Sequence, residues 1–219
     1  MAMNFEQARQ NMVENQVRPW EVLEYSVLDT LKAIRREDFV APAHRNVAFA
    51  DLNLPLGHDE VMMKPVIEGR VLQAVALTKT DEVLEIGTGS GYLTACLANL
   101  AGKVTSIDMH ADFVEAARQR LSAAGVANAT VAVAEAVNGY TPAGVFDVVV
   151  VTGAVHAVPE KFVRWLKPGG RMFVVRGDSP AQTAVLLTHE GEGRYREESL
   201  FETDLPYLAH AAPVKRFVL

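Results

Sequence analysis

A short apolar run followed by alternating glycines is the feature that most constrains what this sequence can form. The run Val83–Ile86 has the apolar, β-branched character of a buried strand, and a helical pattern begins at Tyr92. Three glycines stand between them, at Gly87, Gly89 and Gly91. Glycine lets the backbone adopt conformations that a Cβ forbids, so a ligand can lie against bare main chain beside the free N–H groups of a helix. The stretch predicts a strand, a ligand-binding loop and a helix.

Composition excludes several classes of protein. The 219 residues are 49% hydrophobic and 22% charged, enough for one buried core or a core with a small lobe. A net charge of −6 without a dense Lys/Arg block argues against a sequence-independent grip on nucleic acid, although a folded RNA substrate stays open. Cys96 is the single cysteine and no signal-peptide pattern opens the chain, so we expect a cytoplasmic protein. No apolar run reaches the roughly 18 residues that span a bilayer.

The N-terminal third predicts a helical cap over the core. Apolar residues at helical spacing indicate helices over 4–17 and 21–34, and another from Pro65 to Val75. Proline and glycine punctuate Phe39–Pro42 and Asp51–Gly57, which we expect to be irregular connections that include a mobile substrate loop.

Beyond the glycine loop, short apolar strands alternate with helices. This order predicts an α/β fold, a doubly wound and mostly parallel sheet with helices on both faces and ligands at the carboxyl ends of its strands. A glycine turn at 190–193 joins two last strands into an antiparallel hairpin at the sheet edge. The predicted strands are 83–86, 104–107, 130–134, 146–151, 171–175, 184–188 and 195–201. We expect residues 1–78 to form the cap and substrate loop and residues 79–219 the ligand-binding α/β domain, packed as one unit.

The glycine spacing distinguishes between two nucleotide cofactors. A dinucleotide fingerprint, G-x-G-x-x-G, requires glycine at position 92, where this chain has Tyr92. The pattern is instead Glu85-x-Gly87-x-Gly89-x-Gly91, with Asp108 at the end of the next strand. This arrangement resembles that of class I S-adenosylmethionine-dependent methyltransferases, with a seven-stranded Rossmann-like sheet, and we favour it over the NAD interpretation.

The resemblance implies a set of cofactor contacts. Asp108 can accept hydrogen bonds from both ribose hydroxyls, and Glu85 can face the methionyl ammonium directly or through water. Glu135 follows the third strand of this region, where the resembled class often has an acidic residue near the adenine amino group; a solvated loop acid is the alternative. The predicted cofactor-binding residues are Glu85, Gly87, Thr88, Gly89, Ser90, Gly91, Asp108, Met109, Glu135 and Ala136.

Motifs in both halves of the chain are similar to the protein-L-isoaspartate O-methyltransferase family. The similarity runs from the Val-Glu-Asn-Gln segment at 13–16 through Leu-Pro-Leu-Gly at 54–57 to the glycine loop. It continues in Val151–Ala154 and in the Leu-Lys-Pro-Gly-Gly turn at 166–170. The resemblance implies an enzyme that methylates the carboxylate of isoaspartyl residues in damaged proteins.

One segment departs from that family. Its members usually continue from Leu-Pro-x-Gly into Gly-Gln-Thr-x-Ser and a proline, and the two hydroxyls contact the substrate carboxylate. Here Val61 and Met63 stand at the hydroxyl positions, and Asp59 and Glu60 bring negative charge beside the site. The acceptor-side candidates are therefore His58, Asp59, Met63 and His156, with His58 as a base for a changed acceptor or as a solvated loop residue.

Three functions follow from these patterns. The leading one is isoaspartyl methylation; the second is methylation of a small molecule or an RNA; the third is a non-catalytic protein that only binds S-adenosylmethionine. The expected partner under the first is a protein or peptide that carries isoaspartyl residues, with no membrane. His44, His110, His189 and His210 share no spacing with a carboxylate or cysteine that predicts a metal site.

Overall fold

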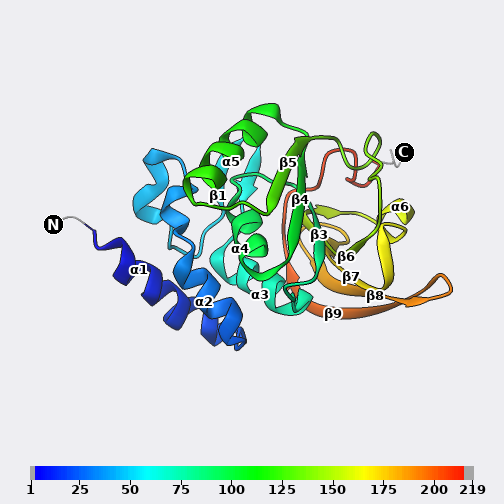
Figure 1. The fold of residues 1–219 in the computed structure, drawn as a ribbon, viewed down its shortest axis with the longest axis horizontal. Coiled ribbons are helices and arrows are strands. Elements are labelled where there is room, and N and C mark those ends of the chain that lie inside the picture. The colour runs from blue at the N-terminus through cyan, green and yellow to red at the C-terminus, as the bar shows by residue number, and fades with distance from the viewer. Residues whose placement is uncertain (1–2, 215–219) are drawn as a thin grey trace, which may run out of the picture.

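A seven-stranded sheet forms the centre of the structure, a computed structural model that describes residues 3–214 (Figure 1). The strand order is β5-β4-β3-β6-β7-β8-β9, and β1 pairs with β2 in a separate hairpin. Neighbours from β5 through β7 are parallel, whereas β8 and β9 join antiparallel. The strands are β1 Leu54–Gly57, β2 Glu60–Met62, β3 Glu82–Ile86, β4 Lys103–Asp108, β5 Ala129–Val133, β6 Phe146–Val155, β7 Leu166–Arg176, β8 Gln182–Gly191 and β9 Arg194–Thr203. The α-helices are α1 Phe5–Met12, α2 Tyr25–Ala33, α3 Pro65–Val75, α4 Tyr92–Leu100, α5 Ala111–Ala123 and α6 Glu160–Val163.

Helices cover both faces of the parallel part of the sheet. Successive side chains of a strand point to opposite faces. Accordingly, Val148 and Val150 of β6 belong to the core under α3, α4 and the N-terminal helices, while Val149 and Val151 belong to the core around α6. All four valines are fully buried. This two-sided burial explains why β6 is an uninterrupted apolar run, and it confirms the predicted doubly wound fold.

The predicted strands and the terminal hairpin are confirmed, but one connection was assigned wrongly. The segment Asp51–Gly57, expected to be irregular, includes strand β1, in which Leu54 pairs with Met62 and Pro55 with Val61 of β2. The two-residue turn between these strands, His58-Asp59, has φ of +53° and +62°. Two positive φ values are typical of a type I′ hairpin turn, and asparagine and glycine usually provide them. The histidine-aspartate pair gives no such sequence signal, which explains the error.

The cap consists of short helical pieces. The predicted helix over 4–17 is α1 continued by a π-helical turn, Val13–Val17, and a 3₁₀ turn at Arg18–Trp20 precedes α2. Glu21, with φ of +64°, interrupts the helical conformation between the 3₁₀ turn and α2. Of the predicted connection Phe39–Pro42, residues 39–41 lie between two 3₁₀ helices, Arg36–Asp38 and Pro42–Val47, and Pro42 begins the second. Within residues 3–214, no helix has the length and apolar character needed to cross a bilayer.

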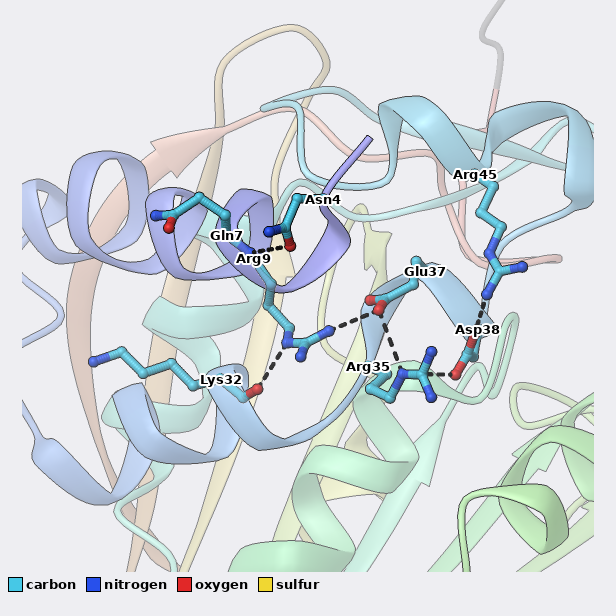
Figure 2. A network of polar contacts seen from close by, with 8 residues as sticks. All are labelled: Asn4, Gln7, Arg9, Lys32, Arg35, Glu37, Asp38 and Arg45. Atoms are coloured by element: carbon cyan, nitrogen blue, oxygen red, sulfur yellow. Dashed lines mark hydrogen bonds and ion pairs between the residues drawn. The ribbon is translucent and has the colours of Figure 1, made fainter. Parts of the chain in front are cut away.

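A buried ion pair fastens α1 to the segment that follows α2 (Figure 2). The Arg9 guanidinium lies 2.7 Å from Glu37 Oε1 and donates to the carbonyl of Lys32 at 2.8 Å. The Glu37 side chain is only 1% exposed, so water does not replace a lost partner. Arg35, more exposed, approaches the same oxygen at 3.4 Å. Arg9 is therefore the principal counter-charge of a buried carboxylate.

We predict that Arg9→Met lowers the free energy of unfolding by about 3 kcal/mol, because it leaves the Glu37 carboxylate buried without its principal counter-charge. Chemical denaturation monitored by circular dichroism measures this loss. Arg164→Met is the matched control, since Arg164 also pairs with a glutamate, Glu160, but both side chains are largely exposed. The control should change stability by less than about 1 kcal/mol. Equal losses in the two variants would contradict the role assigned to Arg9.

Candidate active site

The glycine loop at the end of β3 is the floor of the candidate site. Gly87, Gly89 and Gly91 have φ of +96°, +49° and +84°, in the region that L side chains rarely adopt. A Cβ on Gly87 would lie 2.1 Å from Thr152 Oγ1. That hydroxyl donates to the carbonyls of Ile86 and Gly87, at 2.9 and 2.8 Å, and so holds the start of the loop. The alternating glycines are thus required by backbone geometry and by close approach.

An open cleft lies at the carboxyl ends of the parallel strands, which is where ligands bind in such sheets. The glycine loop and the ends of β4, β5 and β6 form one side, and the β1–β2 hairpin, α3 and a C-terminal segment cover the other. The predicted residues that line it are Gly87, Thr88, Gly89, Ser90, Asp108, Met109, Glu135 and Ala136.

Asp108 is held as a hydrogen-bond acceptor at the edge of the cleft. It ends β4, and its side chain is tied to the loop because Oδ2 accepts from the Gly89 N–H at 2.8 Å. Oδ1 accepts from the His110 N–H at 3.0 Å. Each carboxylate oxygen keeps a further lone pair, so Asp108 can also accept from a ligand's hydroxyl groups. The arrangement fits the ribose contact that the sequence predicts.

Glu135 lines the cleft but is bonded to its own turn. Oε1 accepts from the Val137 N–H at 2.6 Å, and Oε2 accepts from the Asn138 N–H at 2.8 Å. The side chain therefore shapes the turn after β5. Its proposed contact with an adenine amino group stays a prediction.

Glu85 does not line the cleft, although the sequence singles it out. The side chain is fully buried, and Oε2 accepts from the hydroxyls of Thr94 and Ser106, the latter at 2.6 Å. Ser106 Oγ in turn lies 2.6 Å from the hydroxyl of Thr88, a residue that lines the cleft. A relay of two hydroxyl groups thus separates Glu85 from any ligand. Burial raises the pKa of Glu85 to about 8, so the carboxyl is mostly protonated at neutral pH.

Of the four acceptor-side candidates, only Met63 lines the cleft. His58 and Asp59 form the hairpin turn, and the His58 ring points to α5, where Nε2 lies 3.0 Å from Asp112 Oδ2. His156 lies 3.0 Å from Asp178 on an exposed surface. Neither His58 nor His156 lines the cleft: the left-handed turn directs the first towards α5, and the second contacts Asp178 at the surface.

The hairpin turn rests on the start of α5. The rings of His58 and His110 stack with centroids 4.0 Å apart, and Phe113 packs edge-on against both. One ligand atom each from His58, His110 and Asp112 lies within 4.8 Å of the others. Sequence spacing does not reveal this group, because the histidines lie on different elements. Its evident effect is to close the hairpin against the edge of the cleft.

Two parts of the lining were missed by sequence reasoning. One is the segment Leu205–Ala209, which lies along the end of β6 because Ala154 exchanges backbone hydrogen bonds with Pro206 and Leu208, both at 2.8 Å. The other is Glu68 of α3, which lines the cleft yet is 2% exposed. A charged residue among the apolar positions of a buried helix was the available signal for Glu68.

The comparisons with known proteins decide the family. The family model for protein-L-isoaspartate(D-aspartate) O-methyltransferase matches residues 7–205 of this chain. The chain belongs to this family. A protein-L-isoaspartate O-methyltransferase of Methylorubrum extorquens (strain PA1) is 36% identical over 189 residues, which cover 86% of this chain and 82% of the relative. A second, from Methanoculleus marisnigri, is 37% identical over 186 residues, which cover 85% and 84%.

Solved structures show that the fold is shared. A Plasmodium falciparum structure described as a protein-L-isoaspartate O-methyltransferase in complex with S-adenosyl-L-homocysteine aligns with a TM-score of 0.79 at 17% identity, over 91% of this chain and 97% of that one. Another protein-L-isoaspartate O-methyltransferase aligns with a TM-score of 0.78 at 24% identity, over 91% and 65%. Family membership confirms the predicted class, an S-adenosylmethionine-dependent O-methyltransferase.

The buried Glu85 carboxyl should make stability depend on pH. Its ordinary pKa of 4.5 rises to about 8 on folding, so the folded protein binds this proton more tightly than the unfolded chain. Its contribution is complete below about pH 4.5 and is lost as the pH rises towards 8. We predict that the free energy of unfolding of the wild type falls relative to Glu85→Gln between pH 5 and pH 8.

Denaturant titrations of the two proteins at each pH measure this difference. Glu82→Gln, at the exposed start of the same strand, controls for the loss of one negative charge. A difference between wild type and Glu85→Gln that does not change with pH would show that Glu85 is ionised in the folded protein.

Proposed function

We propose that this protein transfers a methyl group from S-adenosylmethionine to the side-chain carboxylate of isoaspartyl residues in proteins and peptides. The observation that carries the proposal is that the family match, residues 7–205, includes every element of the cleft up to Leu205. Relatives that are 36% identical to this chain are named as methyltransferases for this acceptor. We also propose the cytoplasm as its compartment, in keeping with the single unpaired cysteine, Cys96.

The residues of the cleft suit the cofactor. Bound S-adenosylmethionine would supply an electrophilic methyl group on a sulfonium sulfur. The bare backbone of Gly87–Gly89 admits close approach, and Asp108 offers acceptors for ribose hydroxyls. Ala134 and Ala136 provide a small apolar surface beside Glu135 for the adenine. The chain thus contributes shape and hydrogen-bond acceptors.

The acceptor side contributes orientation more than acid–base chemistry. An isoaspartyl carboxylate has a pKa near 4, about that of aspartate, and is already ionised at neutral pH, so it needs no general base. The requirement is to hold that carboxylate in line with the methyl group. Val61 and Met63 form an apolar wall there in place of the two hydroxyls expected for the family. Glu60 also lines the cleft, and burial raises the pKa of its carboxyl.

A methyl-transfer assay tests the proposal. Purified protein is incubated with S-adenosylmethionine and either an isoaspartyl peptide or the same peptide with normal aspartate, and mass spectrometry follows the methyl ester. The proposal requires ester on the isoaspartyl peptide alone. If the cofactor binds and neither peptide is methylated, the isoaspartyl acceptor is excluded.

The apolar wall favours a second candidate acceptor class. Neither Val61 nor Met63 can hydrogen-bond to a carboxylate through its side chain, and Glu60 adds an acidic group beside them. A small molecule or RNA with a neutral or cationic acceptor would suit this lining better, and a protein that binds the cofactor without transfer is the remaining possibility. The same assay separates isoaspartyl methylation from both of these cases, since only the first proposal yields a peptide ester.

We predict that Val61→Thr/Met63→Ser raises kcat/KM for the isoaspartyl peptide by roughly tenfold to a hundredfold. A hydrogen bond to a charged group contributes about 1.5–3 kcal/mol, and the double variant restores two possible donors. Met63→Ala with Val61 unchanged is the matched control, because threonine has nearly the shape of valine, and alanine removes the same bulk as serine without adding a hydroxyl. An equal gain in both variants would mean that the wild-type wall acts only by crowding the substrate.

A further inference from the structure

A buried carboxylate, that of Glu68, lines the cleft but belongs neither to the glycine loop nor to the end of a strand. Glu68 lies in the first turn of α3, beside the buried residues Val66, Ile67 and Gly69. The side chain is 2% exposed, yet it forms part of the cleft wall with Met63 and Leu93. An acidic group without water needs a counter-charge and ligands for its oxygens.

Arg36 provides the counter-charge on one side only. Its Nη1 donates to Glu68 Oε2, and the guanidinium also donates to the carbonyls of Ala48 and Met63, both at 2.7 Å. The group lies over the Tyr92 ring with its Cζ 4.8 Å from the ring centroid. Arg36 itself is fully buried. Among residues 3–214, no donor bonds Glu68 Oε1, so one oxygen of a fixed carboxylate is left for a ligand.

Glu68 and Glu135 line the cleft from different elements. Glu135 follows β5, and Asp108 ends β4, the next strand in the sheet. Glu68 lies near the end of the glycine loop, because the Arg36 guanidinium that bonds it packs over the ring of Tyr92, the residue after Gly91. The cleft therefore has acidic side chains after β5, at the end of β4 and beside the glycine loop that follows β3. Three such positions match the three parts of S-adenosylmethionine: adenine, ribose and the methionyl tail.

We propose that Glu68, held by Arg36, accepts a hydrogen bond from the α-ammonium group of the cofactor's methionyl tail. The inference rests on S-adenosylmethionine as the cofactor. It reassigns the contact that the sequence suggests for Glu85, which is separated from the cleft by Thr88 and Ser106. Arg36 is a positioning residue, because it touches Glu68 and the Met63 backbone and does not line the cleft.

The electrostatic surroundings of Glu68 favour a cationic ligand group. Burial raises the pKa of Glu68 to about 7 despite the opposing effect of Arg36, so one counter-charge does not fully compensate for the loss of water. Arg36 is the charged group that acts on Glu68, and Glu68 in turn helps to raise the pKa of the buried Glu85. An ammonium group against Oε1 would add a second favourable charge and satisfy the remaining oxygen.

Calorimetric titration with two ligands tests the contact without any methyl transfer. S-adenosylhomocysteine has the ammonium-bearing tail, and 5′-methylthioadenosine is the corresponding nucleoside thioether without it. For Glu68→Gln we expect the Kd of S-adenosylhomocysteine to rise about tenfold to a hundredfold, the size of one charged hydrogen bond, while the Kd of methylthioadenosine stays within about twofold. Glu68→Asp, which keeps the charge, should fall between wild type and Glu68→Gln. Glu115→Gln, exposed on α5, is the control and should leave both affinities unchanged.

An equal loss of affinity for both ligands, or no loss for either, overturns the assignment. If Glu68→Gln does not fold, the wild type is titrated with S-adenosylhomocysteine and its deamino analogue. Equal affinity for those two ligands likewise overturns it, and preference for the amine by at least about tenfold supports it. Failure of the wild type to bind S-adenosylhomocysteine at all would instead contradict the proposed cofactor.

Discussion

The buried guanidinium of Arg36 is the interaction on which the arrangement of the cleft depends. It links the carbonyl of Ala48, the carbonyl of Met63 and the carboxylate of Glu68, and it lies against the ring of Tyr92 at the start of α4. Four segments from different parts of the chain therefore meet at one charge. A buried charge is tolerated only when it is paired and hydrogen-bonded. Each of these segments must therefore stay in place for the guanidinium to keep its partners.

This constraint joins the cap to the cofactor loop. Tyr92 directly follows the third glycine, and its ring packs against Phe39 as well as Arg36. Arg9 and Glu37 fix the neighbouring 3₁₀ turn to α1 (Figure 2). Because Arg36 begins that turn, the same contact helps to position it. The β2–α3 connection then lies over the cleft, with Met63 and Glu68 facing it. The acceptor side and the cofactor side are thus parts of one packed unit.

Much of this architecture could be predicted from local sequence. The glycine spacing, the carboxylate of Asp108 at a strand end and the apolar strands depend on the backbone and on residues nearby, so pattern alone identifies them. The hairpin turn at His58-Asp59 has positive φ without glycine or asparagine, and therefore escaped prediction. The distinction between Glu85 and Glu68 depends on which carboxylate is shielded by hydroxyl groups from other elements. Such tertiary contacts leave no periodic signal in the sequence.

Hydrogen–deuterium exchange with and without S-adenosylhomocysteine tests the central claim most directly, that the glycine loop and the Arg36-held segment form one ligand site. The account predicts that the ligand slows exchange both at residues 87–91 and at residues 60–68, with little change in α1. Protection confined to the glycine loop, with residues 60–68 unaffected, would contradict it.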